Sequence, residues 1–177
     1  YVDDSRSENC KRCGADVRKA TSGNAYDLVI TTERNVQPVR GQTVATSQSA
    51  WRAGYASYLE KWAAAKTPVL VIHDTPFPGA TGGPVPDCLA NLPGGAETSS
   101  CDGARSKWVP NDPLYTAAAE IPGIRRVDLS DSICLPSVCP AIVGGVIVYF
   151  DQSHLSASYS GSMTEVLTQT VREHLSR

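Results

Sequence analysis

The sequence lacks several features that would assign it to a familiar class. It has no excess of one charge, because 16 Lys and Arg balance 18 Asp and Glu. We therefore expect no basic stripe and no nucleic-acid partner. It also has no apolar run near the roughly 20 residues of a membrane helix, and no internal repeat or linker. We expect a single soluble domain over residues 1–177, with 41% apolar residues to build its core.

Cysteine is present, in contrast, as three close pairs: Cys10 with Cys13, Cys88 with Cys101, and Cys134 with Cys139. Six thiols allow many connectivities, but pairing of neighbours is the simplest, because the last two pairs each close a loop rich in Pro, Gly and Ser. Zinc is the alternative for Cys10-x-x-Cys13, yet no second motif completes a tetrahedral set. We predict three disulfides, no metal and no cofactor. Disulfides in turn predict an oxidising compartment outside the cytoplasm.

The first half of the chain has the pattern of a strand, a long helix and a second strand. β-branched and aromatic residues predict strands over 24–32 and 68–74. Apolar residues spaced three and four apart predict a helix over 47–66. Strand, helix and strand in this order are typical of a βαβ unit, so the predicted class is α/β with a parallel sheet. The apolar stripe of the helix is expected in the core: Trp51, Tyr55, Tyr58, Leu59 and Trp62.

The remaining segments are less regular. The sequence predicts a polar loop over 1–9, a short helix over 10–20, a long loop stapled by a disulfide over 77–111, a helix over 113–121 capped by Asp112, a strand over 124–129, a strand or bent hairpin over 141–150, and a last helix from about 158 to 175.

An apolar run near the C-terminus ends at Asp151-x-x-His154. The run follows Gly144-Gly145 and predicts a buried strand, so both polar residues lie where that strand ends and a turn begins. A spacing of three in a turn lets the carboxylate accept the Nδ1 proton of the imidazole. This contact fixes the tautomer and leaves Nε2 free to act as a base. The alternative is an Asp that caps a helix, followed by a surface His.

Polar residues also follow the two strands of the βαβ unit, as Glu33-Arg34-Asn35 and His73-Asp74-Thr75. Ligands of open α/β sheets bind at the carboxyl ends of the strands, so we expect these two exits and the Asp151 turn to converge.

The same residues have simpler interpretations. A structural hydrogen bond explains His73 more simply than a place in the cleft does. His174 lies in the last turn of the predicted helix, where a positive charge interacts favourably with the helix dipole. Glu33 and Asp74 suggest a glycosidase carboxylate pair, but nothing in the sequence fixes their separation.

Three motifs are more discriminating together than any of them alone: Tyr149-x-Asp151-x-x-His154-Leu155-Ser156, Cys134-x-x-x-x-Cys139-Pro140, and Val71-Ile72-x-Asp74-Thr75-Pro76. In combination they resemble the C-terminal SGNH domain fused to acyltransferase-3 membrane proteins, which are bacterial envelope O-acyltransferases. The resemblance runs from about Cys10 to the C-terminus. It implies an SGNH-hydrolase-like (flavodoxin-like) three-layer sandwich with a mainly parallel sheet. It also implies that Asp151 orients His154 and that His154 activates a serine.

The resemblance further implies a function and a location. The domain would lie outside the cytoplasm, tethered through a membrane domain that is absent from this chain and that supplies the acyl donor. It would pass an acyl group, expected to be acetyl, through a serine ester to a hydroxyl of a cell-envelope carbohydrate or glycolipid. The alternatives are an SGNH esterase or deacetylase, and a non-catalytic glycan-binding domain.

Two motifs of this family are missing from the sequence. The Gly-Asp-Ser block of the nucleophile occurs nowhere in the 177 residues, and Asp4-Ser5 neither follows a strand nor has a Gly before it. We therefore expect the first strand and the nucleophile block to precede Tyr1 in the natural protein, which would make this domain N-terminally incomplete. The Gly-x-Asn-Asp block of the oxyanion hole is replaced by Thr32-Glu33-Arg34-Asn35, where Asn35 or Arg34 would serve. The alternative is an ordinary solvated strand exit.

Overall fold

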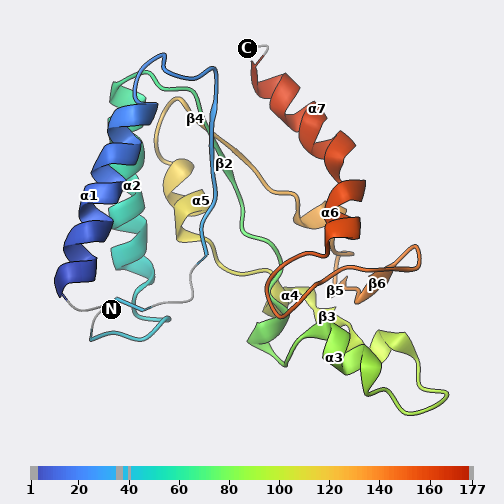
Figure 1. The fold of residues 1–177 in the computed structure, drawn as a ribbon. Helices are drawn as coiled ribbons and strands as arrows, with labels where there is room; N and C mark the ends of the chain where they lie inside the picture. Colours follow the sequence, from blue (N-terminus) through green and yellow to red (C-terminus); the bar gives the residue numbers. More distant parts are fainter. Residues whose placement is uncertain (1–3, 35–37, 40, 176–177) are drawn as a thin grey trace. The chain divides into compact units, whose positions relative to one another are not determined.

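The computed structural model describes residues 4–34, 38–39 and 41–175 (Figure 1). They form two compact units, each of which is built from two segments of the chain. Tyr1–His73 and Asp112–Val127 make up the first, here called the sheet unit. Asp74–Asn111 and Asp128–Arg177 make up the second, here called the disulfide unit. The single domain expected from the sequence stays a prediction.

The sheet unit contains a parallel sheet of three strands in the order β1-β2-β4. The strands are β1 (Val29–Thr31), β2 (Val69–Ile72) and β4 (Ile124–Val127), and Val69 lies opposite both Val29 and Ile124. Helix α2 (Gln48–Ala64) connects β1 to β2, which confirms the predicted βαβ unit and the α/β class. The central strand β2 is an unbroken apolar run, as expected for a strand that is covered on both faces. Leu70, for example, is fully buried.

The core of the sheet unit lies where α2 and α5 (Pro113–Ala118) pack on the sheet. Leu59 and Trp62 of α2 meet Leu114 of α5 in one buried cluster with the strand residues. Helix α5 begins as the sequence predicts, because the Asp112 carboxylate accepts a hydrogen bond from the Tyr115 N–H at 2.7 Å.

Helix α1 (Asp4–Thr21) begins earlier than the sequence suggests, so the loop predicted over 1–9 is wrong from residue 4 onward. The helix is polar, and pairs three residues apart support it, such as Lys11 with Glu8 at 2.6 Å. A helix of this kind has no apolar period to reveal it. Two hydrogen bonds attach it to α2, one from Tyr58 Oη to the Gly14 carbonyl and one from Trp62 Nε1 to Thr21 Oγ1.

The predicted disulfide between Cys10 and Cys13 is not formed, and both thiols are free and exposed on α1. The reason is geometric. Residues three apart on a helix lie on nearly the same face, but their Cβ atoms are about 5–6 Å apart, whereas a disulfide needs a separation of about 3.5–4.5 Å.

The disulfide unit is built from much shorter elements. They are 3-10 helix η1 (Pro78–Ala80), α3 (Val85–Ala90), η2 (Thr98–Cys101), β3 (Gly103–Ala104), α4 (Arg105–Trp108), η3 (Ser130–Ser132), β5 (Val138–Cys139), β6 (Ile142–Val143), β7 (Val146–Ile147), α6 (Ala157–Ser162) and α7 (Thr164–Leu175). The long loop predicted over 77–111 therefore contains several helical turns. The predicted disulfides Cys88–Cys101 and Cys134–Cys139 are both formed.

The segment over 141–150 is the bent hairpin of the two expected alternatives. Strands β6 and β7 pair antiparallel, and Gly144 and Gly145 both have positive φ, of 57° and 79°. Such a two-residue turn matches the twist of the strands. The final helix predicted over 158–175 is interrupted at Met163, which separates α6 from α7. No helix in the described part of the chain is both long and apolar enough to span a bilayer.

Candidate active site

The turn that carries Asp151 and His154 closes a short antiparallel ladder after β7. Tyr149 pairs with Leu155, and the Phe150 N–H donates to the His154 carbonyl at 2.8 Å. Within the turn, Oδ1 of Asp151 accepts hydrogen bonds from the backbone N–H groups of Ser153 (2.7 Å) and His154 (2.8 Å). An Asp side chain that satisfies the backbone ahead of it is a common way to hold a turn in one conformation. Asp151 thus shapes the loop that presents His154.

The second oxygen of the same carboxylate contacts the imidazole. Oδ2 of Asp151 lies 2.8 Å from Nδ1 of His154, which is the contact that the spacing of three predicts. The His154 side chain is 68% exposed, and its Nε2 forms no hydrogen bond with any described residue. The arrangement can therefore hold one tautomer and leave Nε2 available as a base. The catalytic roles of both residues stay predictions.

The pKa of the Asp151 carboxyl is held well below its ordinary value of 3.8. The hydrogen bond with His154 is the largest cause, and the Ser153 and His154 N–H groups and the Ser153 hydroxyl add to it. All of these contacts favour the ionised form. Asp151 is therefore a carboxylate throughout the neutral range, and it can accept a hydrogen bond from Nδ1–H of His154 there.

Ser153 is a residue of this site that the sequence analysis missed. Its hydroxyl lies 3.0 Å from Oδ1 of Asp151 and 3.1 Å from Nδ1 of His154. A hydroxyl at this place restrains both members of the pair. The only signal in the sequence is a Ser between the Asp and the His, which by itself is too common to identify a site.

A buried aromatic pair supports the ladder from inside the disulfide unit. Tyr149 is 1% exposed, and its ring meets Trp108 edge to face at 5.5 Å between centroids. Trp108 in turn covers Gly103, where a Cβ would come within 1.8 Å of the indole. Burial raises the pKa of the Tyr149 hydroxyl, which has no partner among the described residues. The residue before Phe150 is thus fixed in the core.

Gly79 forms a backbone contact with the turn that carries Asp151. Its N–H donates to the Gln152 carbonyl at 3.0 Å, within the Asp151 turn itself. A Cβ at Gly79 would lie 2.5 Å from the Phe77 ring and 3.3 Å from Cβ of Gln152. Glycine therefore permits the close approach of this segment to the turn.

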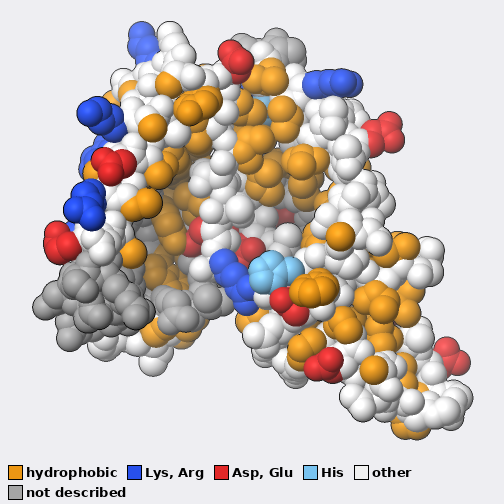
Figure 2. Space-filling view, viewed as in Figure 1, with side chains coloured by type: hydrophobic (Ala, Val, Ile, Leu, Met, Phe, Trp, Pro, Cys, Tyr) orange, Lys and Arg blue, Asp and Glu red, His pale blue; other side chains and the backbone are white. Residues whose placement is uncertain are grey.

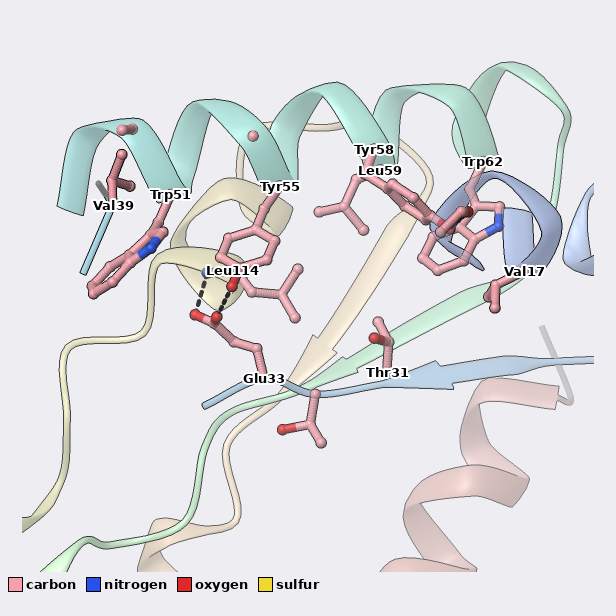
Figure 3. A pocket seen from close by; sticks show the side chains of 14 residues that line it. Val17, Thr31, Glu33, Val39, Trp51, Tyr55, Tyr58, Leu59, Trp62 and Leu114 are labelled. Atoms are coloured by element: carbon pink, nitrogen blue, oxygen red, sulfur yellow. Dashed lines mark hydrogen bonds between the residues drawn. The ribbon is translucent and has the colours of Figure 1, made fainter. Parts of the chain in front are cut away.

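The sheet unit has a pocket of its own, of about 610 Å³. Figure 3 shows aromatic side chains of α2 projecting toward β1, with Glu33 reaching up to Tyr55 and Leu114. The Glu33 carboxylate accepts hydrogen bonds from the Tyr55 hydroxyl and the Leu114 N–H. The aromatic stripe was expected in the core. Leu59 and Trp62 are indeed buried, whereas Trp51, Tyr55 and Tyr58 are partly exposed, and all five residues line this pocket.

The predicted convergence of three strand exits stays a prediction, because it joins residues of both units. The same holds for Glu33 with Asp74 as a carboxylate pair. Arg34 is exposed, and Asn35 lies outside the described residues. Their predicted part in an oxyanion hole is thus untested.

The two other histidines have structural contacts. The His73 ring meets Tyr115 edge to face at 5.0 Å, and the backbone N–H of His73 donates to the Val127 carbonyl. His174 donates from Nδ1 to the Thr170 carbonyl at 2.6 Å. Among the residues described, no group of three or more His, Cys, Asp or Glu is arranged to hold a metal.

The fold and the site now define a class: an α/β protein with an Asp-His pair at a turn. The chain belongs to the family of SGNH domains fused to AT3 domains, which it matches over residues 1–169. The resemblance found in the sequence is thereby confirmed. No curated protein sequence matches the chain significantly.

One solved structure has a similar fold, the periplasmic domain of the lipopolysaccharide acetyltransferase from Salmonella ser. Paratyphi A. The two share 14% sequence identity, with a TM-score of 0.55 over 91% of this chain. The chain spans 61% of that domain's length. At this identity the likeness shows the fold, and it supports the predicted SGNH-like class.

Proposed function

We propose that this chain is the extracytoplasmic acyl-transfer domain of a membrane O-acyltransferase. It would move an acyl group, most simply acetyl, onto a hydroxyl of a cell-envelope glycan or glycolipid. The contact between Asp151 and His154 carries the proposal, because it occurs in a chain of the family fused to AT3 domains. The similar fold is that of a periplasmic domain from an acetyltransferase, and two disulfides fit an oxidising compartment.

In the proposed reaction the acyl group is first held as a serine ester. Nε2 of His154 removes the proton from the acceptor hydroxyl while the hydroxyl oxygen attacks the ester carbonyl. The bond from the carbonyl carbon to the serine oxygen then breaks, and the serine takes the proton from Nε2. Asp151 accepts a hydrogen bond from the Nδ1–H group throughout and stabilises the transient imidazolium. The serine is that of the family's Gly-Asp-Ser block, which these 177 residues do not contain.

Two alternatives use the same residues differently. In an esterase or deacetylase, water takes the place of the sugar hydroxyl. In a glycan-binding domain, no covalent step occurs and the Asp-His pair serves only to hold the turn. The imidazole has Nδ1 bound to a carboxylate and Nε2 exposed, which is what a general base needs, and this favours chemistry over binding.

The test is His154→Ala in the natural full-length protein, with acyl transfer to the envelope glycan measured by mass spectrometry in cells that lack the native copy. Loss of a general base lowers the rate by about 10²- to 10⁴-fold. The matched control is His174→Ala, which removes the same side chain from α7 of the same unit and is expected to leave transfer unchanged.

Each alternative gives a distinct result. Unchanged acylation in the His154→Ala protein would refute the proposal and favour a binding domain. If the wild-type protein releases the acyl group to water and never to a glycan, the esterase is the better description.

A further inference from the structure

Phe150 precedes the Asp-His turn and is 72% exposed. Single apolar side chains on a surface are ordinary, so exposure alone indicates nothing. The informative feature is its position in the ladder that presents His154.

The ladder fixes which side chains share a face. Tyr149 and Leu155 are paired, so the next residues inward, Phe150 and His154, lie directly opposite each other. The hydrogen bond from the Phe150 N–H to the His154 carbonyl agrees with this register. Successive side chains of a strand point to opposite faces, and Tyr149 points into the core. Phe150 and His154 therefore project from the outer face, in agreement with their exposure of 72% and 68%.

The position of Phe150 is held firmly although its ring is open to solvent. Tyr149 before it is packed on Trp108, and the turn after it is fixed by the Asp151 carboxylate. The space-filling view shows histidine atoms at the surface, and hydrophobic side chains also reach the surface at many places (Figure 2). A rigid backbone thus presents an exposed aromatic ring next to the base.

We propose that Phe150 is the platform on which the acceptor sugar rests during acyl transfer. The inference rests on the proposed function, in which the hydroxyl next to Nε2 of His154 belongs to a carbohydrate. One face of a pyranose ring carries mainly C–H groups, and these pack against the face of an aromatic ring through dispersion and its quadrupole. The contact would place a ring hydroxyl toward the imidazole. A short acyl chain would instead need an enclosing pocket.

The experiment compares transfer to sugar with hydrolysis by water in the purified full-length protein. For Phe150→Ala we expect the KM for the glycan acceptor to rise about tenfold or more, because the apolar contact is lost. Hydrolysis of the acyl-enzyme in the absence of glycan should stay at the wild-type rate, since water needs no platform. Phe150→Trp should restore the acceptor KM. The matched control is Leu135→Ala, which truncates another exposed side chain (59%) of the same unit and should change neither reaction.

The outcomes separate this inference from the function on which it rests. An unchanged acceptor KM in Phe150→Ala, while His154→Ala loses both reactions, overturns the platform and leaves the acyl-transfer proposal intact. Equal loss of transfer and hydrolysis in Phe150→Ala also overturns it, because that result indicates a general disturbance of the turn. If His154→Ala retains both reactions, the proposed function itself fails.

Discussion

The two units of the chain build their cores in different ways. The sheet unit relies on long regular elements, and its apolar cluster needs no disulfide among the described residues. The disulfide unit has strands of only two residues, and two disulfides and an aromatic pair hold its cluster together. Yet the disulfide unit carries the Asp-His pair. The contact between Asp151 and His154 is therefore held by local restraint of a turn and not by an extended sheet.

Backbone hydrogen bonding shows the same contrast. In the sheet unit the parallel ladders satisfy the central strand on both sides. In the disulfide unit, backbone groups are satisfied by single hydrogen bonds between loops. The Phe77 N–H donates to the Trp108 carbonyl at 2.6 Å, and the Ala141 N–H donates to the Asp102 carboxylate at 2.7 Å. Irregular backbone is stable only where each such group finds a partner. The stability of the disulfide unit should accordingly be more sensitive to the loss of a single hydrogen bond or disulfide.

The largest effect is expected from removing the disulfide that closes the longer loop. Replacing both Cys88 and Cys101 with Ser should lower the free energy of unfolding by about 3 kcal/mol in the chain-entropy model. The loss should fall on the disulfide unit, as measured by denaturation followed with hydrogen exchange of each unit. Replacing the free thiols Cys10 and Cys13 with Ser is the control and should cost little. Equal loss of hydrogen-exchange protection in both units would show that they unfold together, and would contradict the expectation that only the disulfide unit depends on this disulfide.

A smaller effect, of opposite sign in the two units, is expected from two glycines. Gly103→Ala forces a Cβ against the Trp108 ring and should destabilise the disulfide unit by about 2 kcal/mol. Gly54→Ala on α2 meets nothing within 4 Å and should stabilise the sheet unit by up to about 1 kcal/mol. Thermal melts of both variants test the pair. An unchanged melting temperature of Gly103→Ala would show that the Trp108 ring can move away from residue 103, and it would contradict the tight packing of this aromatic pair.

The smallest effect concerns pH and the Asp-His turn. Because folding lowers the pKa of Asp151, its stabilising contribution is full above the unfolded value of about 3.9, and it is lost as the pH falls toward the folded pKa. Asp151→Asn should therefore destabilise the protein more at pH 6 than at pH 3. Carboxyl NMR titration provides the direct measurement, and His154→Ala should move the Asp151 midpoint upward. A wild-type midpoint at or above 3.8 would contradict the proposed hydrogen bonding.

Some parts of the fold could be predicted because local pattern and tertiary environment agree. Val69-Leu70-Val71-Ile72 is continuous and β-branched, as a strand buried on both faces must be. The contact between Asp151 and His154 follows from a spacing of three in a turn, so it needed no distant partner. The Asp112 cap is equally local.

Other parts could not be predicted, since long-range contacts decide them. The polar helix from Asp4 carries no apolar period. The run before Asp151 has the composition of a buried strand, but Gly144 and Gly145 turn it into a hairpin outside the parallel sheet. The partly exposed aromatic residues of α2 have a helical period whether they face a core or a pocket.

The sequence by itself determined the α/β class, the family and the Asp-His pair, because each rests on local spacing or on a short motif. It made the pairings Cys88–Cys101 and Cys134–Cys139 the simplest ones, and the structure contains both. Only the tertiary structure decided that Phe150 stands opposite His154, that Trp108 and Gly103 support the ladder, and that Cys10 and Cys13 stay unpaired. The first two features depend on register and close packing, which residues distant in the chain fix together, and the third depends on the Cβ separation that the helix α1 imposes.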